Sequence, residues 1–222
     1  YGLYPSEFRR LRMLPGIEAT NLPVDGTMPP VRRLRDFQTS LAALPAETPV
    51  AYWDAGDVLF QASLKPLWEL VRRNPDKLLA VREPRGYPEN AAVAAWTLSI
   101  RDPVHRRIAF QALSTHPFLN SGFAAGTARA LLAYFREADR WLRGRELAGT
   151  SDWGDQTALN LYCHTRPEAW LEAEQGWNYC VHDRPRGMFR TLPDGRMASS
   201  DGTPIYAAHG NARSLRKFAI LR

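Results

Sequence analysis

Long apolar runs are what this sequence of 222 residues lacks most clearly. No stretch approaches the roughly 18 consecutive apolar residues that indicate a transmembrane helix. No secretory signal, with its basic start and short apolar core, opens the chain. We therefore expect no membrane span within this stretch, and we expect a cytoplasmic location.

Cysteines are also scarce. The only two, Cys163 and Cys180, lie in neither a Cys-x-x-Cys pattern nor a Cys/His spacing suited to a metal. This pattern favours two reduced, partly buried thiols and does not indicate a cysteine-based metal site. A disulfide between the two stays open.

Acidic side chains are outnumbered, with 23 Asp and Glu against 29 Lys and Arg, so the formal charge is +6. A basic balance favours anionic partners such as nucleotides, acidic glycans, nucleic acids or lipid head groups. Of these, nucleic acid is the partner we expect least. Repeats and low-complexity tracts are absent, and the length suits one α/β domain spanning residues 1–222.

Apolar patterning predicts strands that alternate with helices. Short apolar runs indicate strands at 50–53, 78–81 and 205–208, and a further strand ending at 118–119. Helical spacing covers 31–44, 64–73, 105–114, 127–142 and 155–163. This alternation favours an α/β sandwich with a mixed, mostly parallel sheet flanked by helices.

Polar residues gather at the ends of these predicted elements. Three clusters follow predicted strands and a fourth opens a predicted helix. In chain order they are Asp54 with Asp57, Asn120 with Ser121 and Gly122, Asp152 with Asp155 and Gln156, and His209 with Asn211. Because ligands of open α/β sheets gather at the carboxyl ends of strands, we expect the clusters to converge on one site.

Asp54 and Asp57 are the candidates for holding a metal. They lie three residues apart between apolar runs, with Gly56 between them. Hard cations such as Mn²⁺ or Mg²⁺ prefer carboxylate oxygens and keep coordination positions open for phosphate. A polar turn between two hydrophobic strands is the structural alternative, and the segment alone does not decide between them.

The other clusters have structural alternatives too. His209 is followed by Gly210, which lets a ligand approach the backbone, and the basic residues Arg213 and Lys217 come next. These basic residues could bind phosphate, or they could form a basic tail exposed to solvent. Asp155 can cap its helix or face a substrate, and Asn120 can belong to a simple turn.

Taken in order, the four clusters resemble glycosyltransferases of the GT-A fold, of the collagen galactosyltransferase and lysyl hydroxylase glycosyltransferase-domain type. The stretch from Asp54 to Asp57 resembles that family's Asp-x-x-Asp motif, and Leu119 to Gly122 its Leu-Asn-Ser-Gly. His209 to Asn211 resembles its His-Gly-Asn. Asp155-Gln156 resembles the end of its Asp-Asp-Gln, although Gly154 replaces the first Asp.

The resemblance implies a nucleotide-sugar donor, most simply a UDP-sugar, and a glycan, peptide or lipid acceptor. Asp54, Asp57 and His209 would hold Mn²⁺ or Mg²⁺, and Asp155, with Asp152 near it, would serve catalysis. The implied donor-binding residues are Trp53, Asp54, Asn120, Ser121, Gly122, Gln156, Asn211, Arg213, Lys217 and Arg32 or Arg33. Only 53 residues precede Asp54, so we expect the first strand of such a fold to be missing before Tyr1.

Three other function classes stay open. A phosphohydrolase of the haloacid dehalogenase type would use Asp54 as nucleophile, but both Asp-Gly-Thr stretches, at 25–27 and 201–203, lack the Asp-x that precedes it in that class. A nucleotidyltransferase would share the same kind of sheet. A basic, non-catalytic module that binds carbohydrate or nucleic acid would need no metal.

Overall fold

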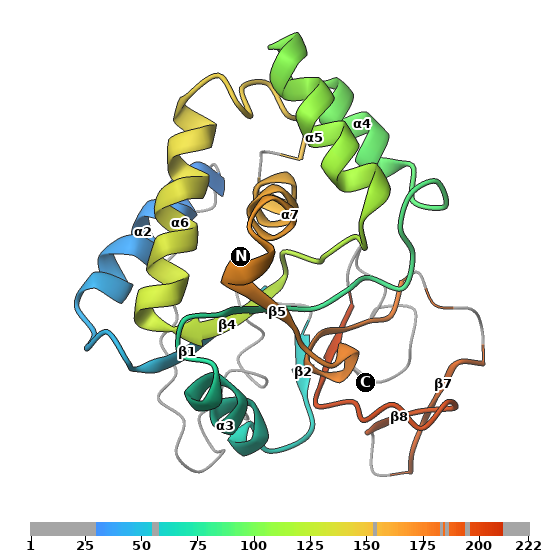
Figure 1. The fold of residues 1–222 in the computed structure, drawn as a ribbon. Coiled ribbons are helices and arrows are strands. Elements are labelled where there is room, and N and C mark those ends of the chain that lie inside the picture. The colour runs from blue at the N-terminus through green and yellow to red at the C-terminus, as the bar shows by residue number, and fades with distance from the viewer. Residues whose placement is uncertain are drawn as a thin grey trace.

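The computed structural model describes residues 30–54, 58–152, 155–182, 184, 187–193 and 196–210 (Figure 1). Its α-helices are α2 (Pro30–Ala42), α3 (Lys65–Arg73), α4 (Ala92–Leu98), α5 (Pro103–Thr115), α6 (Ala128–Arg143) and α7 (Asp155–Thr165). Two short 3-10 turns are η1 (Pro167–Ala169) and η2 (Gln175–Asn178). The strands are β1 (Pro49–Trp53), β2 (Val58–Phe60), β3 (Leu78–Ala80), β4 (Phe123–Thr127), β5 (Trp170–Glu172), β6 (Tyr179–Cys180), β7 (Phe189–Thr191), β8 (Met197–Ser199) and β9 (Ala207–His209).

The main sheet has the strand order β1-β4-β3-β5 and is mixed, as predicted. Strand β4 runs antiparallel to both of its neighbours, whereas β3 and β5 are parallel. Three strands thus share one direction, but two of the three pairings are antiparallel. The prediction of a mixed, mostly parallel sheet is therefore confirmed for the strand directions, and both antiparallel pairings come from the single reversed strand β4, which lies inside the sheet.

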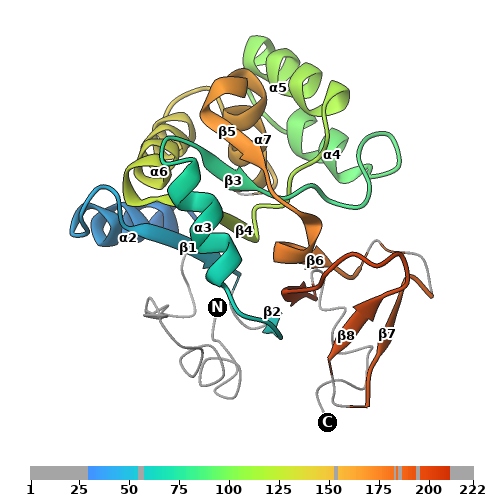
Figure 2. The same ribbon diagram turned by 60° about the horizontal axis from the view of Figure 1, so that its bottom comes forward.

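Two smaller sheets complete the described chain (Figure 2). Strand β9 pairs with β2 in antiparallel fashion and with β6 in parallel fashion, and β7 and β8 form an antiparallel pair. Gln61, which follows β2, links β8 to the sheet of β2, β9 and β6. Its side chain forms hydrogen bonds with the backbone of Met197, the first residue of β8, and of Ile205, which precedes β9. Gln61 therefore connects the two smaller sheets.

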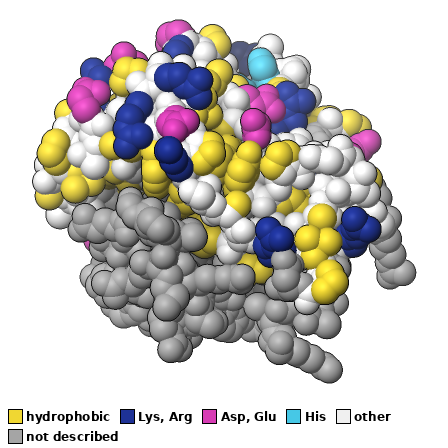
Figure 3. Space-filling model, turned by 90° about the horizontal axis from the view of Figure 1, so that it is seen from below, with side chains coloured by type: hydrophobic (Ala, Val, Ile, Leu, Met, Phe, Trp, Pro, Cys, Tyr) yellow, Lys and Arg dark blue, Asp and Glu magenta, His cyan; other side chains and the backbone are white. Residues whose placement is uncertain are grey.

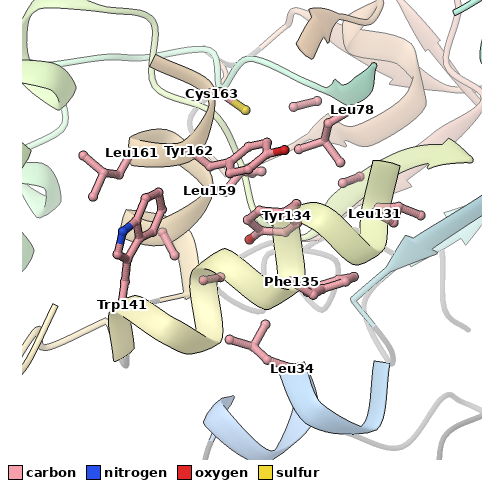
Figure 4. Close-up of a cluster of buried hydrophobic side chains, with 14 of the residues drawn as sticks. Leu34, Leu78, Leu131, Tyr134, Phe135, Trp141, Leu159, Leu161, Tyr162 and Cys163 are labelled. Carbon is pink, nitrogen blue, oxygen red and sulfur yellow. The ribbon is translucent and has the colours of Figure 1, made fainter. Parts of the chain in front are cut away.

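The main sheet buries both of its faces. Along β3, Leu78 and Ala80 join a cluster with α2, α6 and α7, while Leu79 joins a cluster with α3 and the smaller sheet. This alternation follows from the two-residue period of a strand. Figure 4 shows the first cluster, in which Tyr134 of α6 lies beside Tyr162 of α7 and Leu34 of α2 lies on the other side of α6. Helices thus flank the sheet, as the sequence predicted.

The predicted helices are all observed, with boundaries shifted by a few residues. Thr127 explains the start of α6, because its hydroxyl accepts a hydrogen bond from the backbone N–H of Ala130 at 3.2 Å. Helix α4 was not predicted. The strand expected to end at 118–119 is wrong: Leu119 forms only an isolated bridge with Arg82, and β4 begins after the polar cluster rather than before it.

Both cysteines are buried free thiols, so the prediction of reduced cysteines is confirmed.

Among the described residues, no helix combines the length and apolar character needed to cross a membrane. Seen from below, the described surface carries Lys and Arg side chains interspersed with Asp and Glu (Figure 3). The sequence predicted that the first strand of the fold is missing before Tyr1. This prediction concerns the start of the chain, where residues 1–29 lie outside the described ranges.

Candidate active site

Described residues of all four polar clusters converge at one end of the main sheet. Trp53, the last residue of β1, pairs with Phe123, the first of β4, and the N–H of Asp54 donates to the carbonyl of Gly122 at 2.9 Å. Because β4 runs against β1, the residues that precede β4 reach the same edge as those that follow β1. The start of α7 brings Asp155 to this edge, and the end of β9 brings His209.

Arg33 of α2 joins two of the clusters. Its guanidinium donates to Oδ1 of Asp54 at 3.1 Å and to Oδ2 of Asp155. Burial lowers the pKa of Arg33, but the carboxylates of Asp155 and Asp54 outweigh it and raise that pKa above its ordinary value. Arg33 therefore stays charged and forms a cationic bridge between the two acids.

Asp155 lies in a partly buried, acid-rich position. Burial raises its pKa to about 6, and the carboxylates of Asp54 and Asp152 add to the rise, while the charge of Arg33 opposes it. The hydroxyl of Ser121 donates to Oδ1 of Asp155 at 3.3 Å. A carboxylate with a pKa near neutrality, held between a hydroxyl and a guanidinium, is suited to accept a proton.

A buried amide network lies next to Asp155. One carboxylate oxygen of Glu83 accepts hydrogen bonds from Asn120 at 2.6 Å and from Gln156 at 2.9 Å. Gln156 in turn accepts from the hydroxyl of Ser121 at 3.3 Å. Oδ1 of Asn120 accepts from the N–H of Gly122 and from Asn178, each at 2.9 Å. These bonds fix the orientation of the amides behind the site.

His209 lies almost fully buried beside Asp54. Its Nε2 is 4.0 Å from Oδ2 of Asp54, the carboxylate oxygen that Arg33 does not contact. Gly122 makes room for the ring: a Cβ at that position would lie 2.4 Å from Cε1 of His209. A side chain at residue 122 would thus occupy the space of the imidazole.

An oxygen donor and an imidazole nitrogen that face each other suit a divalent ion such as Mn²⁺. Asp54 and His209 therefore fit part of the expected metal site. Within the described ranges, no group of three His, Cys, Asp or Glu side chains is placed to hold a metal. The third expected ligand, Asp57, lies outside those ranges.

Two predicted site residues are engaged in structural contacts. Trp53 donates from its indole nitrogen to the carbonyl of Trp177 at 2.8 Å and packs edge-on against Phe60. Oδ2 of Asp152 accepts from both the backbone N–H and the hydroxyl of Thr157, at 2.7 Å each. Asp152 thus holds the first turn of α7.

Several expected donor-binding residues cannot be placed in the site. Asn211, Arg213 and Lys217 lie outside the described ranges, as does the side chain of Arg32, whose backbone belongs to α2. Its neighbour Arg33 is the residue that reaches the carboxylates.

Sequence reasoning missed Glu83 and Asn178. Glu83 opens the stretch 83–90, which is rich in Pro and charge and has no helical or strand pattern, and Asn178 ends a short 3-10 turn. Glu83 is an isolated acid, the third residue after β3, so its position near a strand end was a usable signal. Asn178 carried no such signal.

The described residues thus define a mixed α/β protein with an acidic and amide-lined site at one end of its main sheet. No family model matches the sequence, and no curated protein matches it.

Among solved structures, the chain is similar to the galactosyltransferase LgtC in complex with donor and acceptor sugar analogues, with a TM-score of 0.47 and 18% identity over 81% of this chain and 57% of that one. It is also similar to mouse xyloside xylosyltransferase 1 in its apo form, with a TM-score of 0.49 and 16% identity over 82% of this chain and 65% of that one. The matches span less than two thirds of each of those proteins.

Proposed function

We propose that this protein is a metal-dependent glycosyltransferase that moves a sugar from a nucleotide-sugar donor, a UDP-sugar, to an acceptor hydroxyl. The observation that carries the proposal is the meeting of Asp54, Asp155 and His209 at one end of the sheet, with Arg33 bridging the two acids. A divalent ion that stabilises the charge of the leaving diphosphate and a carboxylate that accepts a proton beside it suit glycosyl transfer from a nucleotide-sugar.

Asp54 and His209, with Asp57, would hold Mn²⁺ or Mg²⁺. When bound, the ion would neutralise the negative charge that the diphosphate gains as it leaves. Of the residues outside the described ranges, Asn211, Arg213 and Lys217 would contact the phosphates. Arg32 would approach the donor from α2.

Asp155 would be the catalytic carboxylate. With its pKa raised to about 6, it is largely ionised at neutral pH and can take the proton of the acceptor hydroxyl. In a reaction that retains the configuration of the sugar, the same carboxylate would stabilise positive charge on the anomeric carbon. Asn120, Ser121 and Gln156 would orient the donor sugar beside it, since their amides and hydroxyl are already fixed by hydrogen bonds.

The acceptor is a hydroxyl of a glycan, a peptide or a lipid. Because acceptor hydroxyls in all three classes share the same chemistry, the choice depends on surfaces beyond the reacting atoms. A nucleotidyltransferase would instead bind a nucleoside triphosphate and release pyrophosphate, and assays with both donors separate the two functions.

The first test is a calorimetric titration with UDP, with and without Mn²⁺. Binding that needs the metal, and that disappears in Asp57→Ala, supports the proposal. The matched control is Asp76→Ala, because Asp76 is exposed and pairs with Arg129 on the surface. Metal-independent binding, or normal binding by Asp57→Ala, would contradict the metal assignment. A screen of UDP-sugars for hydrolysis and transfer then identifies the donor.

A further inference from the structure

Arg33 is held in place by a rigid pair of helices. Its neighbour Leu34 is buried between α2 and α6, and Phe37 of α2 stacks on Phe135 of α6 with ring centroids 5.0 Å apart. Gln38 donates to the carbonyl of Phe135. These contacts fix α2 against α6, so the position of the Arg33 guanidinium beside the carboxylates depends on this packing.

The two oxygens of Asp54 face different partners. Oδ1 accepts from Arg33 at 3.1 Å, and Oδ2 faces Nε2 of His209 at 4.0 Å. The side chain of Arg33 is only 19% exposed, so water screens its charge poorly. A divalent ion that binds between Asp54 and His209 would therefore lie a few ångströms from a buried positive charge.

We propose that the positive charge of Arg33 weakens the binding of a divalent ion when no nucleotide is bound. The ion would therefore bind together with a nucleotide diphosphate. The inference rests on the proposed function. Without the donor, Arg33 partly neutralises Asp54 and Asp155 and repels a second cation. The diphosphate brings negative charge to the ion, which offsets this repulsion.

Such an arrangement makes metal and nucleotide binding reciprocal. If the nucleotide strengthens metal binding by some factor, the metal strengthens nucleotide binding by the same factor. Removing the charge of Arg33 should raise the affinity for the metal alone. The further increase in metal affinity when the nucleotide binds should then be smaller. This expectation separates a charge effect from a purely structural role, because a structural role would weaken metal binding when Arg33 is replaced.

The experiment titrates the protein with Mn²⁺ and follows the free ion by electron paramagnetic resonance, first alone and then with saturating UDP. The variants are Arg33→Gln, which removes the charge, and Arg33→Lys, which keeps it without the two-pronged geometry. Arg140→Gln is the control, because it removes one charge from a surface ion pair with Glu137 and Glu146. Thermal unfolding with and without Mn²⁺ shows that each variant folds.

Arg33→Gln should bind Mn²⁺ alone about tenfold more tightly or better, given the strength of charge interactions at this separation. Arg33→Lys and Arg140→Gln should stay within about threefold of the wild type, and the gain on adding UDP should shrink only in Arg33→Gln. Unchanged or weaker Mn²⁺ binding by Arg33→Gln overturns the inference. If that variant does not fold, a tenfold change in Arg33→Lys overturns it instead.

The outcomes also separate this inference from the proposed function. Equal Mn²⁺ binding by wild type and Arg33→Gln, with UDP binding still dependent on the metal, rejects the role of Arg33 and leaves the glycosyltransferase proposal standing. Absence of Mn²⁺ binding in every variant rejects both the inference and the metal assignment.

Discussion

The imidazole of His209 occupies the space in which residue 122 would carry a side chain. A Cβ on Gly122 would lie 2.4 Å from Cε1 and 3.0 Å from Nδ1 of His209, and 2.7 Å from Oδ1 of Asn120. Real side chains do not approach so closely, so residue 122 must be glycine for the ring and the amide to keep their positions. One small residue thus connects the candidate metal ligand with the amide network.

We predict that Gly122→Ala displaces His209 and weakens Mn²⁺-dependent UDP binding by about tenfold or more. It should also lower the free energy of unfolding by about 1–3 kcal/mol, because the site is tightly packed. Calorimetry and urea denaturation measure the two effects. Gly86→Ala is the control, since the nearest atom to its Cβ would be 4.0 Å away. Wild-type binding by Gly122→Ala would show that His209 is not a ligand.

Replacing Asp155 tests the catalytic carboxylate. Asp155→Asn should reduce turnover by about a hundredfold or more, the usual contribution of a general base. UDP binding should change by only a few-fold, since the metal ligands stay in place. Steady-state kinetics and calorimetry give the two numbers. An equal loss in both would favour a role in capping α7 instead.

The raised pKa of Asp155 predicts the pH dependence of turnover. A base acts only when it is ionised, so the rate should rise as the pH increases through about 6 and level off above about 7. A buffer series from pH 5 to 8 with saturating donor measures this, and Asp155→Asn should lose the rise. A rate that is flat across this range would remove Asp155 as the base.

Glu83 stabilises the network without touching Asp155 in any described contact. Glu83→Ala should lower the free energy of unfolding by about 2–4 kcal/mol, because it leaves the buried amides of Asn120 and Gln156 without their acceptor. Turnover should fall more than metal binding. Glu89→Ala, at an exposed position nearby, should change neither quantity. Equal stability of the two variants would contradict the assigned network.

His164 predicts a loss of stability in acid. Burial lowers its pKa to about 4, against the bond to the carbonyl of Pro117, and the stacked His116 lowers it further. The unfolded chain therefore binds a proton below about pH 6.5 that the native protein does not, so stability falls as the pH drops from about 6.5 to 4.

The loss due to His164 should be about 1–2 kcal/mol, allowing for the part of the ring that water reaches. Urea denaturation at pH 7 and pH 4.5 measures it. His164→Gln keeps a donor for Pro117 and should lose this part of the acid sensitivity, whereas His182→Gln at the surface should retain it. The same acid sensitivity in His164→Gln would contradict the assignment.

Much of the fold could be predicted from periodicity. The amphipathic patterns that became α2, α3 and α6 each bury one stripe of apolar residues, whereas α7 is buried all round from Gln156 to Cys163. The direction of β4 could not be predicted, since a five-residue run such as Phe123–Thr127 has the same pattern in either direction. Helix α4 is short and has few large apolar residues, so its period is weak.

The candidate site was predictable in part. Asp54, Asn120, Asp155 and His209 mark the ends of elements, and their convergence followed from the topology of open sheets. The bridge made by Arg33 was not predictable, because an arginine on an amphipathic helix usually faces solvent. Only packing of α2 on α6 turns this side chain toward the two acids.

The pairing of β2 with β9 brings Val58 against His209, two residues from nearly opposite ends of the described chain. Contacts between such distant residues are costly in chain entropy and tend to form after local ones. The helices and the main sheet can therefore assemble the cluster around α2, α6 and α7, which contains no residue of β9, while that strand is still unpaired. A chain that has folded only this far would carry Asp54, yet it would have no completed site until β9 pairs with β2 and brings His209 beside that carboxylate.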